Sequence, residues 1–131
     1  MRTNTDALRI MIVEDEAVIA LVLADALKDE GYRIVGPFAR QHEALAMLDY
    51  ARPDAAILDL TLQDGVCSGL ARELRSRDLP FLVYSGHDRK RGSTDDLDDV
   101  PWIEKPGRLD EITAALDTLV LPDHIGTRRN Q

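Results

Sequence analysis

The sequence predicts an α/β protein built on a doubly wound parallel sheet with helices on both faces. Five short segments rich in Val, Ile, Leu and aromatic residues alternate with segments that carry helical periodicity. This alternation is typical of a parallel sheet covered by helices. The chain has 131 residues, 44% hydrophobic and 31% charged, which fits a single globular domain with one ordinary core.

The predicted strands are short apolar segments, each bounded by turn-forming or charged residues. They are Arg9–Val13, Tyr32–Val35, Asp54–Leu58, Phe81–Tyr84 and Trp102–Glu104. Helical patterns lie between them and after the last one, at Glu16–Glu30, Gln41–Tyr50, Cys67–Arg77 and Leu109–Leu119. Gly31 directly follows the first helical pattern, where a glycine commonly ends a helix.

The fourth crossover, residues 87–100, carries the weakest helical signal. It has few apolar residues, a glycine in its middle and little periodicity. We expect a short or irregular fourth helix started by Ser93 or Thr94, or a mobile loop. Residues 121–131 include Pro122 and show no periodicity, so we expect them to form a flexible tail.

Composition excludes several classes of function. The net charge is −8 and the Lys and Arg residues are scattered among acids, which argues against a nucleic-acid surface. Residues 1–8 lack the apolar core of a signal peptide, and no apolar run approaches the length of a membrane span. We therefore expect a cytoplasmic protein that binds neither nucleic acid nor membrane.

Polar residues follow or end four of the predicted strands. Glu14 and Asp15 follow the first, Asp59 the third and Lys105 the fifth, and Ser85 ends the fourth. Ligands of open parallel sheets bind beyond the carboxyl ends of the strands, so these side chains are expected to converge there. Two carboxylates about 4 Å apart repel by about 4 kcal/mol at an effective dielectric constant near 20. Three clustered carboxylates therefore predict a cation, and an all-oxygen ligand set suits Mg²⁺.

Each of these signals is weak when taken alone. Acids after a strand often cap the next helix, and Glu16 is expected to do so. Ser85 alone is more often a turn hydroxyl, and Lys105 before a proline is more often a solvated loop charge. Asp59 is harder to explain structurally, because a carboxylate that ends a buried strand needs a partner. The coincidence at four strand ends favours a functional site.

The ordered set IVEDE, ILDL, VYSGH and IEKP resembles the receiver domain of two-component response regulators over roughly residues 8–120. The resemblance implies a flavodoxin-like sheet with strand order 2-1-3-4-5. It also implies that Asp59 accepts a phosphoryl group, usually from the phosphohistidine of a histidine kinase or histidine phosphotransfer protein. Asp15, Asp59 and the Thr61 carbonyl would then ligate Mg²⁺, with Glu14 acting mostly through water. Ser85 and Lys105 would hold the phosphoryl oxygens.

The resemblance also places Trp102 at the family's aromatic switch position, where it would act with Ser85. A lone Trp is otherwise explained by core packing. The chain departs from the family pattern at Gln63, where Pro is usual, and at Gly107, where Phe is common. These departures put the usual output surface in doubt and leave the phosphorylation site unaffected.

Three functional hypotheses follow. The first is a single-domain response regulator, not an enzyme beyond its own phosphorylation and dephosphorylation, that signals through a downstream protein, with homodimerisation left open. The second is a non-phosphorylated pseudo-receiver that only binds proteins; the presence of the acids, Ser85 and Lys105 argues against it. The third is a dehalogenase-type phosphatase or a flavin carrier. Such a phosphatase needs the motif Asp-x-Asp, but this chain has Thr61 at the second Asp position. A flavin carrier needs a phosphate-binding loop after the first strand, where the acids of EDE would repel the ligand.

Overall fold

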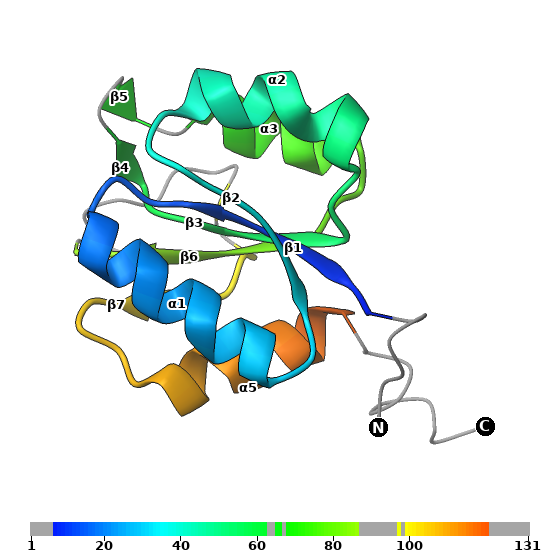
Figure 1. The fold of residues 1–131 in the computed structure, drawn as a ribbon. Helices are drawn as coiled ribbons and strands as arrows, with labels where there is room; N and C mark the ends of the chain where they lie inside the picture. Colours follow the sequence, from blue (N-terminus) through cyan, green and yellow to red (C-terminus); the bar gives the residue numbers. More distant parts are fainter. Residues whose placement is uncertain (1–6, 63–64, 67, 87–96, 98, 121–131) are drawn as a thin grey trace.

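The computed structural model describes residues 7–62, 65–66, 68–86, 97 and 99–120. Within these ranges strands and helices alternate along the chain, as the sequence predicts (Figure 1). The strands are β1 (Arg9–Val13), β2 (Arg33–Phe38), β3 (Ala55–Leu58), β4 (Thr61–Leu62), β5 (Gly65–Val66), β6 (Phe81–Ser85) and β7 (Trp102–Glu104). The helices are α1 (Ala17–Asp29), α2 (Gln41–Ala51), α3 (Ser68–Ser76) and α5 (Leu109–Val120).

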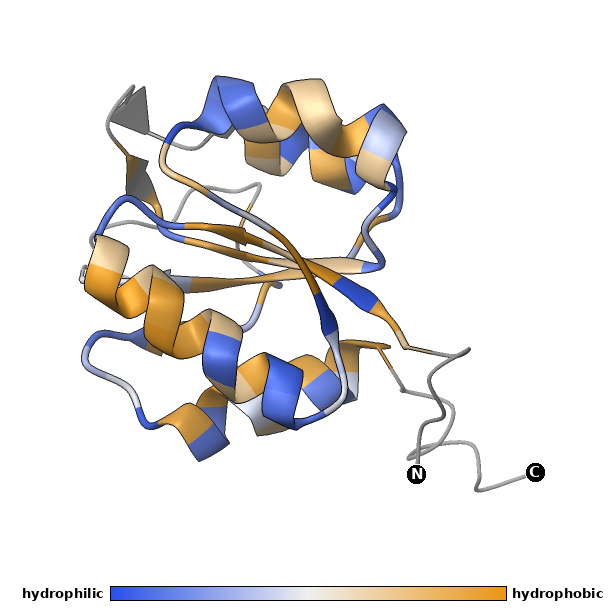
Figure 2. Ribbon diagram, in the orientation of Figure 1, coloured by the Kyte–Doolittle hydropathy of each residue, from blue (hydrophilic) through white to orange (hydrophobic). Residues whose placement is uncertain are grey.

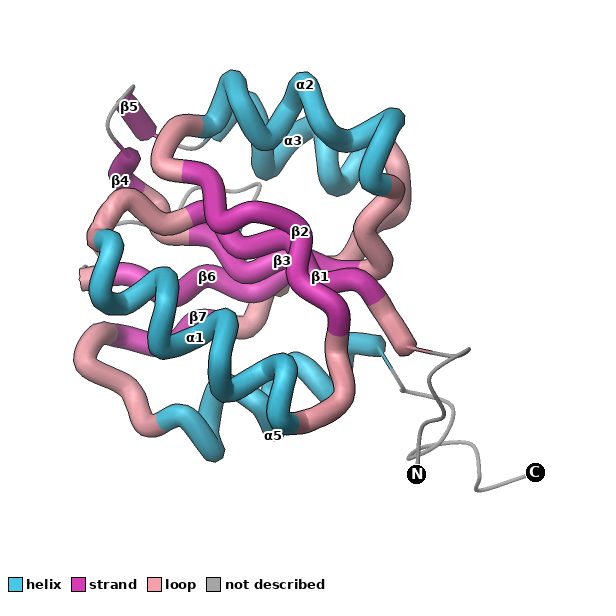
Figure 3. The backbone as a smooth tube through the Cα atoms, viewed as in Figure 1, coloured by secondary structure: helices cyan, strands magenta, loops and turns pink. Residues whose placement is uncertain are grey.

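Five strands form the central sheet in the order β2-β1-β3-β6-β7, and every neighbouring pair is parallel. Counted along the chain within this sheet, the order is 2-1-3-4-5, so the predicted topology is confirmed. Figure 3 shows the five strands side by side between the two helical layers. Because all five strands run the same way, their carboxyl ends meet at one edge of the sheet.

The sheet is covered on both faces, by α1 and α5 on one side and by α2 and α3 on the other (Figure 1). Strand β1 contributes to both cores because its side chains alternate: Ile10 and Ile12 join one cluster, and Met11 and Val13 join the other. Figure 2 shows largely apolar strands lying between helices that carry both apolar and polar residues. Each fully buried side chain of this size stabilises the fold by about 1.5–3 kcal/mol. The end of β1 is therefore firmly held.

Helix α1 ends at Asp29, just before the glycine that the sequence indicates. Gly31 has φ +99°, and its N–H donates to the Lys28 carbonyl at 3.0 Å. The next residue, Tyr32, donates its N–H to the Leu27 carbonyl, also at 3.0 Å. These two bonds form a Schellman motif, which requires a left-handed residue between helix and strand.

Strand β2 continues to Phe38, three residues beyond the predicted end at Val35. The Gly36-Pro37 pair reads as a turn in sequence, but β2 lies at the sheet edge and its pairing with β1 shifts register at this pair, a place where a strand tolerates proline. Gly36 has φ +103°, and a Cβ there would lie 3.0 Å from the Ile12 carbonyl oxygen. The strand therefore passes this point only with glycine.

A second, two-stranded sheet was not predicted. Strands β4 and β5 pair antiparallel just beyond the end of β3, in the segment expected to be a loop. Most of the fourth crossover lies outside the described residues, so a fourth helix stays a prediction; Leu97 and Val100 are described and buried. The predicted tail also lies outside the described residues. None of the helices within the described ranges is long and apolar enough to cross a bilayer.

Candidate phosphorylation and metal site

The sheet brings the predicted site residues to one edge. Glu14 and Asp15 follow β1, Asp59 follows β3, Ser85 ends β6 and Lys105 follows β7. The Asp59 N–H donates to the Val13 carbonyl at 2.8 Å, which holds the end of β3 against the end of β1. Among the described residues, the buried polar or charged side chains are Glu14, Asp59 and Ser85, at 4%, 7% and 1% exposure. Burial of these three at one edge indicates a site rather than ordinary surface.

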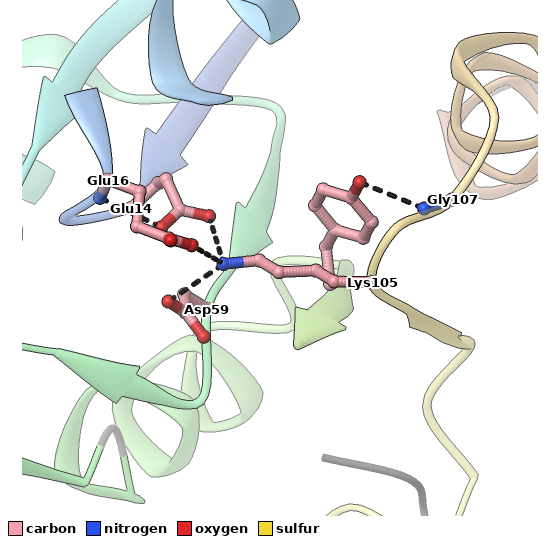
Figure 4. A network of polar contacts seen from close by, with 6 residues as sticks. Glu14, Glu16, Asp59, Lys105 and Gly107 are labelled. Carbon is pink, nitrogen blue, oxygen red and sulfur yellow. Dashed lines mark hydrogen bonds and ion pairs between the residues drawn. The ribbon is translucent and has the colours of Figure 1, made fainter. Parts of the chain in front are cut away.

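The Lys105 ammonium lies at the centre of this edge (Figure 4). Its Nζ is 2.8 Å from Glu14 Oε1, 2.8 Å from Glu16 Oε1 and 3.2 Å from Asp59 Oδ2. A lysine ammonium has three N–H donors, so these three carboxylates satisfy it completely. Lys105 is thus a partly buried cation held by acids from β1 and β3 and the start of α1.

Burial and ion pairing act against each other on the charges of the site. Burial raises the pKa of Glu14 to about 7, although its hydrogen bond from Lys105 lowers it. Burial also opposes the charge of Lys105, but hydrogen bonds to Glu14 and Glu16 outweigh that cost and raise the pKa of Lys105. Three carboxylates therefore surround one ammonium, and the single positive charge does not offset the burial of Glu14.

Three acidic residues lie close enough together to share a divalent cation. In the part of the chain that the structure describes, Glu14, Asp15 and Asp59 form a group whose carboxylate oxygens lie within 4.8 Å of one another. An all-oxygen set of this kind fits Mg²⁺. The Lys105 ammonium is a cation that already pairs with two of these carboxylates, Glu14 and Asp59. Thr61 lies two residues beyond Asp59 at the start of β4; the role of its carbonyl as a ligand stays a prediction.

The prediction for Glu16 was wrong. Glu16 occupies the position before α1, but its side chain makes no capping hydrogen bond. Its N–H donates instead to Glu14 Oε2 at 3.0 Å, and its carboxylate binds Lys105. Glu16 and Lys105 are 89 residues apart. Local sequence patterns carry no signal for such a contact.

A second contact that sequence reasoning missed joins the Lys105 ammonium to an aromatic ring. Nζ lies 5.7 Å from the centroid of the Tyr84 ring, a cation–π distance. The Tyr84 hydroxyl accepts a hydrogen bond from the Gly107 N–H at 3.0 Å (Figure 4). A Cβ at position 107 would lie 2.7 Å from the Ile103 side chain, so this close approach requires glycine. The departure at Gly107 therefore has a local structural reason.

The two residues expected to act as a switch lie on neighbouring strands. Ser85 is fully enclosed, and its carbonyl accepts the Lys105 N–H at 2.7 Å. Trp102 pairs in register with Val83 and packs, partly exposed, against the core cluster that includes Val100. Ser85 is thus linked to Lys105 through a backbone hydrogen bond, while Trp102 is the first residue of β7.

Comparison with protein-family models decides the family. Residues 10–117 match the model for the response regulator receiver domain. The chain belongs to this family. The receiver fold, its strand order and the acidic site at the carboxyl edge are therefore shared family features, and phosphorylation on an aspartate is generic to the family.

Curated relatives of this receiver domain include response regulators of Mycobacterium tuberculosis. The transcriptional regulatory protein PdtaR is 29% identical over 126 residues, which cover 90% of this chain and 60% of PdtaR. The transcriptional regulatory protein TcrA is 36% identical over 122 residues, which cover 88% of this chain and 47% of TcrA. The chain thus spans about half the length of the curated relatives that it matches.

Solved structures agree with the fold. The non-phosphorylated HemR receiver domain from Leptospira biflexa superposes with a TM-score of 0.74 at 28% identity, covering 87% of this chain and 94% of the HemR chain. The response regulator PhyR from Brucella abortus gives a TM-score of 0.77 at 22% identity, covering 95% of this chain and 52% of PhyR. At that lower identity the PhyR likeness supports the fold alone.

Proposed function

We propose that this receiver domain accepts a phosphoryl group on Asp59 from the phosphohistidine of a histidine kinase or histidine phosphotransfer protein. One observation carries the proposal: the Asp59 carboxylate is buried at the end of a central strand, 3.2 Å from the Lys105 ammonium. A buried carboxylate with a cation beside it has both the nucleophilic oxygen and the charge balance that phosphoryl transfer needs.

In the proposed reaction an Asp59 oxygen attacks the phosphorus in line with the leaving imidazole nitrogen. A P–O bond forms, the P–N bond breaks, and its electron pair returns to the imidazole. Lys105 turns its ammonium from the Asp59 carboxylate to the transferring oxygens, and the Ser85 hydroxyl donates to another of them. Glu14, Asp15 and Asp59, with the Thr61 carbonyl, would hold Mg²⁺, which supplies further neutralisation of charge on those oxygens.

The test is phosphorylation by acetyl phosphate in the presence of Mg²⁺. The unchanged chain should gain one phosphoryl group by intact mass, and Asp59→Asn should gain none, because an amide is a poor nucleophile. Asp25→Asn is the matched control, since Asp25 is an exposed aspartate on α1 away from the site, and it should label normally. Undiminished labelling of Asp59→Asn would contradict the assignment.

The alternative function is a pseudo-receiver that only binds proteins. It would keep the fold and fail to label with any phosphodonor. The convergence of Glu14, Asp15, Asp59 and Lys105 favours the phosphorylated form, because a pure binding module has no need of a buried, charged edge.

The proposal includes an output through another protein. The net charge of −8 does not favour binding to nucleic acid, so we expect the output partner to be a protein. The single-domain role stays a prediction, because the curated relatives are about twice as long as the matched region. The size of the native product on an immunoblot would test it.

A further inference from the structure

The three acids that hold Lys105 do not have the same relation to the metal group. Glu14 and Asp59 belong both to the partners of Lys105 and to the carboxylates that converge for a cation. Glu16 contacts the ammonium at 2.8 Å and lies outside that convergent group. Asp15 belongs to the convergent group and is not among the acids that pair with Lys105. The ammonium and a divalent cation therefore compete for two carboxylates, and Glu16 serves Lys105 alone.

This competition has an energetic consequence. A cation bound by Glu14 and Asp59 repels an ammonium that stays against the same oxygens. Lys105 must then lose one or two of its three acceptors. A partly buried ammonium without hydrogen-bond partners destabilises the protein, because its desolvation is not compensated. An acceptor that the metal does not use lowers the cost of this displacement.

Glu16 is placed to be that acceptor. Its backbone is fixed by the N–H bond to Glu14 Oε2, while its side chain is 59% exposed and reaches the ammonium from the solvent side. The Lys105 ammonium also lies over the Tyr84 ring, and the Gly107 N–H donates a hydrogen bond to the hydroxyl of that ring. Lys105 thus keeps two contacts that lie outside the convergent acidic group, one with the Tyr84 ring and one with the exposed Glu16 carboxylate; Figure 4 shows the second.

We propose that Glu16 is a positioning residue that retains the Lys105 ammonium while Glu14 and Asp59 turn to a divalent cation. Glu16 acts through Lys105 and does not ligate the metal. The inference rests on the proposed function, because it requires that Glu14, Asp15 and Asp59 bind Mg²⁺.

The experiment is calorimetric titration with Mg²⁺ alone, with no phosphodonor. Glu16→Gln should raise the Kd for Mg²⁺ about threefold to tenfold, because the ammonium is then left with only two charged acceptors, the ones that the metal needs. A double-mutant cycle separates this route from simple loss of charge. In a Lys105→Met background, which keeps an unbranched stem over Tyr84, Glu16→Gln should change the Kd less than about twofold.

Glu104→Gln is the matched charge control. Glu104 is an exposed glutamate next to Lys105 in the chain, and it is not among the acids that hold the ammonium. Its neutralisation should change the Kd much less than Glu16→Gln does. Urea unfolding of every variant in EDTA verifies that each one folds.

Three results would overturn the inference: an unchanged Kd in Glu16→Gln, an equal change in the Lys105→Met background, or an equal change in Glu104→Gln. The last two would reduce Glu16 to a general source of negative charge. Mg²⁺ binding by the unchanged chain together with any of these results leaves the proposed function intact. Failure of the unchanged chain to bind Mg²⁺ at all would overturn both.

Discussion

Glu14 is the residue whose environment most requires a cation. It is 4% exposed, it lies beside Asp59, and burial raises its pKa to about 7. An acid with this pKa is only partly ionised near neutral pH, even though Lys105 donates a hydrogen bond to it. In the metal-free protein, burial therefore favours the neutral form of the Glu14 carboxyl. A second cation nearby would stabilise the ionised form and lower this pKa.

The raised pKa of Glu14 predicts how stability depends on pH in the metal-free protein. Because the folded chain holds this proton more tightly than the unfolded chain, the stabilising contribution is fully present below about pH 4.5. It is lost as pH rises through about 7. Between pH 5 and pH 8 in EDTA, the unfolding free energy of the unchanged chain should fall relative to Glu14→Gln by on the order of 2 kcal/mol.

Urea unfolding of both proteins at the two pH values provides the measurement. The Gln variant has the same shape without the titrating proton, so the difference between the two proteins isolates Glu14. Parallel pH dependence of the two proteins would show that Glu14 ionises as freely in the folded chain as in the unfolded one.

Sequence reasoning succeeded at the residue level where one local feature determines the position. Asp59 and Glu14 follow uninterrupted apolar strands, so their place at the sheet edge could be predicted from local pattern alone. The contacts of Glu16 with Lys105 and of Tyr84 with Gly107 could not be predicted this way. Both join segments that are far apart in sequence, and both depend on side-chain directions that only the packed fold defines.

At the scale of elements, α1 has apolar side chains on more than its buried face. Val18, Leu21 and Val22 are 74%, 61% and 45% exposed, as the nearly continuous apolar run of this helix predicts. With Leu109 of α5 they form the α1 patch, which borders a pocket of about 160 Å³ floored by Tyr84 and Gly107. The patch adjoins the edge of the sheet that carries the candidate site, because Tyr84 lines this pocket and lies 5.7 Å from the Lys105 ammonium.

This placement predicts that the α1 patch docks a helix of the histidine kinase. Val18→Lys and Leu21→Lys should each slow phosphotransfer from a histidine kinase about tenfold or more. Labelling by acetyl phosphate should not change, because the small donor needs no docking surface. Stability should change by less than about 0.5 kcal/mol, since both side chains are largely exposed. The comparison is made by phosphotransfer time courses with each donor.

Ala46→Lys is the control for this prediction, because it places the same new charge on an exposed site of α2, on the opposite face of the sheet from α1. It should leave phosphotransfer from the kinase nearly unchanged. Normal transfer to Val18→Lys and Leu21→Lys would remove the patch as a kinase surface.

The limits of sequence prediction differ between elements. Both ends of β1 were predicted correctly, and β3 was predicted to within one residue, because continuous apolar runs flanked by charge allow few other interpretations. The β4–β5 hairpin was missed because two-residue strands are too short to show a period. β2 was predicted too short, because Gly36-Pro37 indicates a turn until its place at the sheet edge is known.

For the whole molecule, the main feature is the separation of two apolar cores from one polar edge. The cores lie on opposite faces of the sheet, and both reach strands that end at the site. Tyr84 belongs to the core under α1 and α5, while Val83 and Trp102 belong to the opposite side. A change of charge at the edge can therefore act on either core through a shift of β6 or β7.

The switch proposal follows from this arrangement. Phosphorylation would place about two negative charges at Asp59 and offer Ser85 a new acceptor. Ser85 is enclosed and its carbonyl is tied to the Lys105 N–H, so a move of its hydroxyl disturbs the packing between β6 and β7. Trp102 is the large side chain on β7, and it is only partly buried, so it can change its contacts at low cost.

The last prediction therefore concerns the fluorescence of Trp102, the single tryptophan of the chain. Beryllofluoride, a mimic of the phosphoryl group, should change the intensity or anisotropy of Trp102 beyond the change caused by Mg²⁺ alone. Asp59→Asn should abolish this further change, because the mimic has no carboxylate to bind. Ser85→Ala should bind the mimic and show a smaller signal, because the hydroxyl that couples the edge to β7 is absent. A full signal in Ser85→Ala would break the link between Ser85 and Trp102, and no signal in the unchanged chain would exclude Trp102 from the switch.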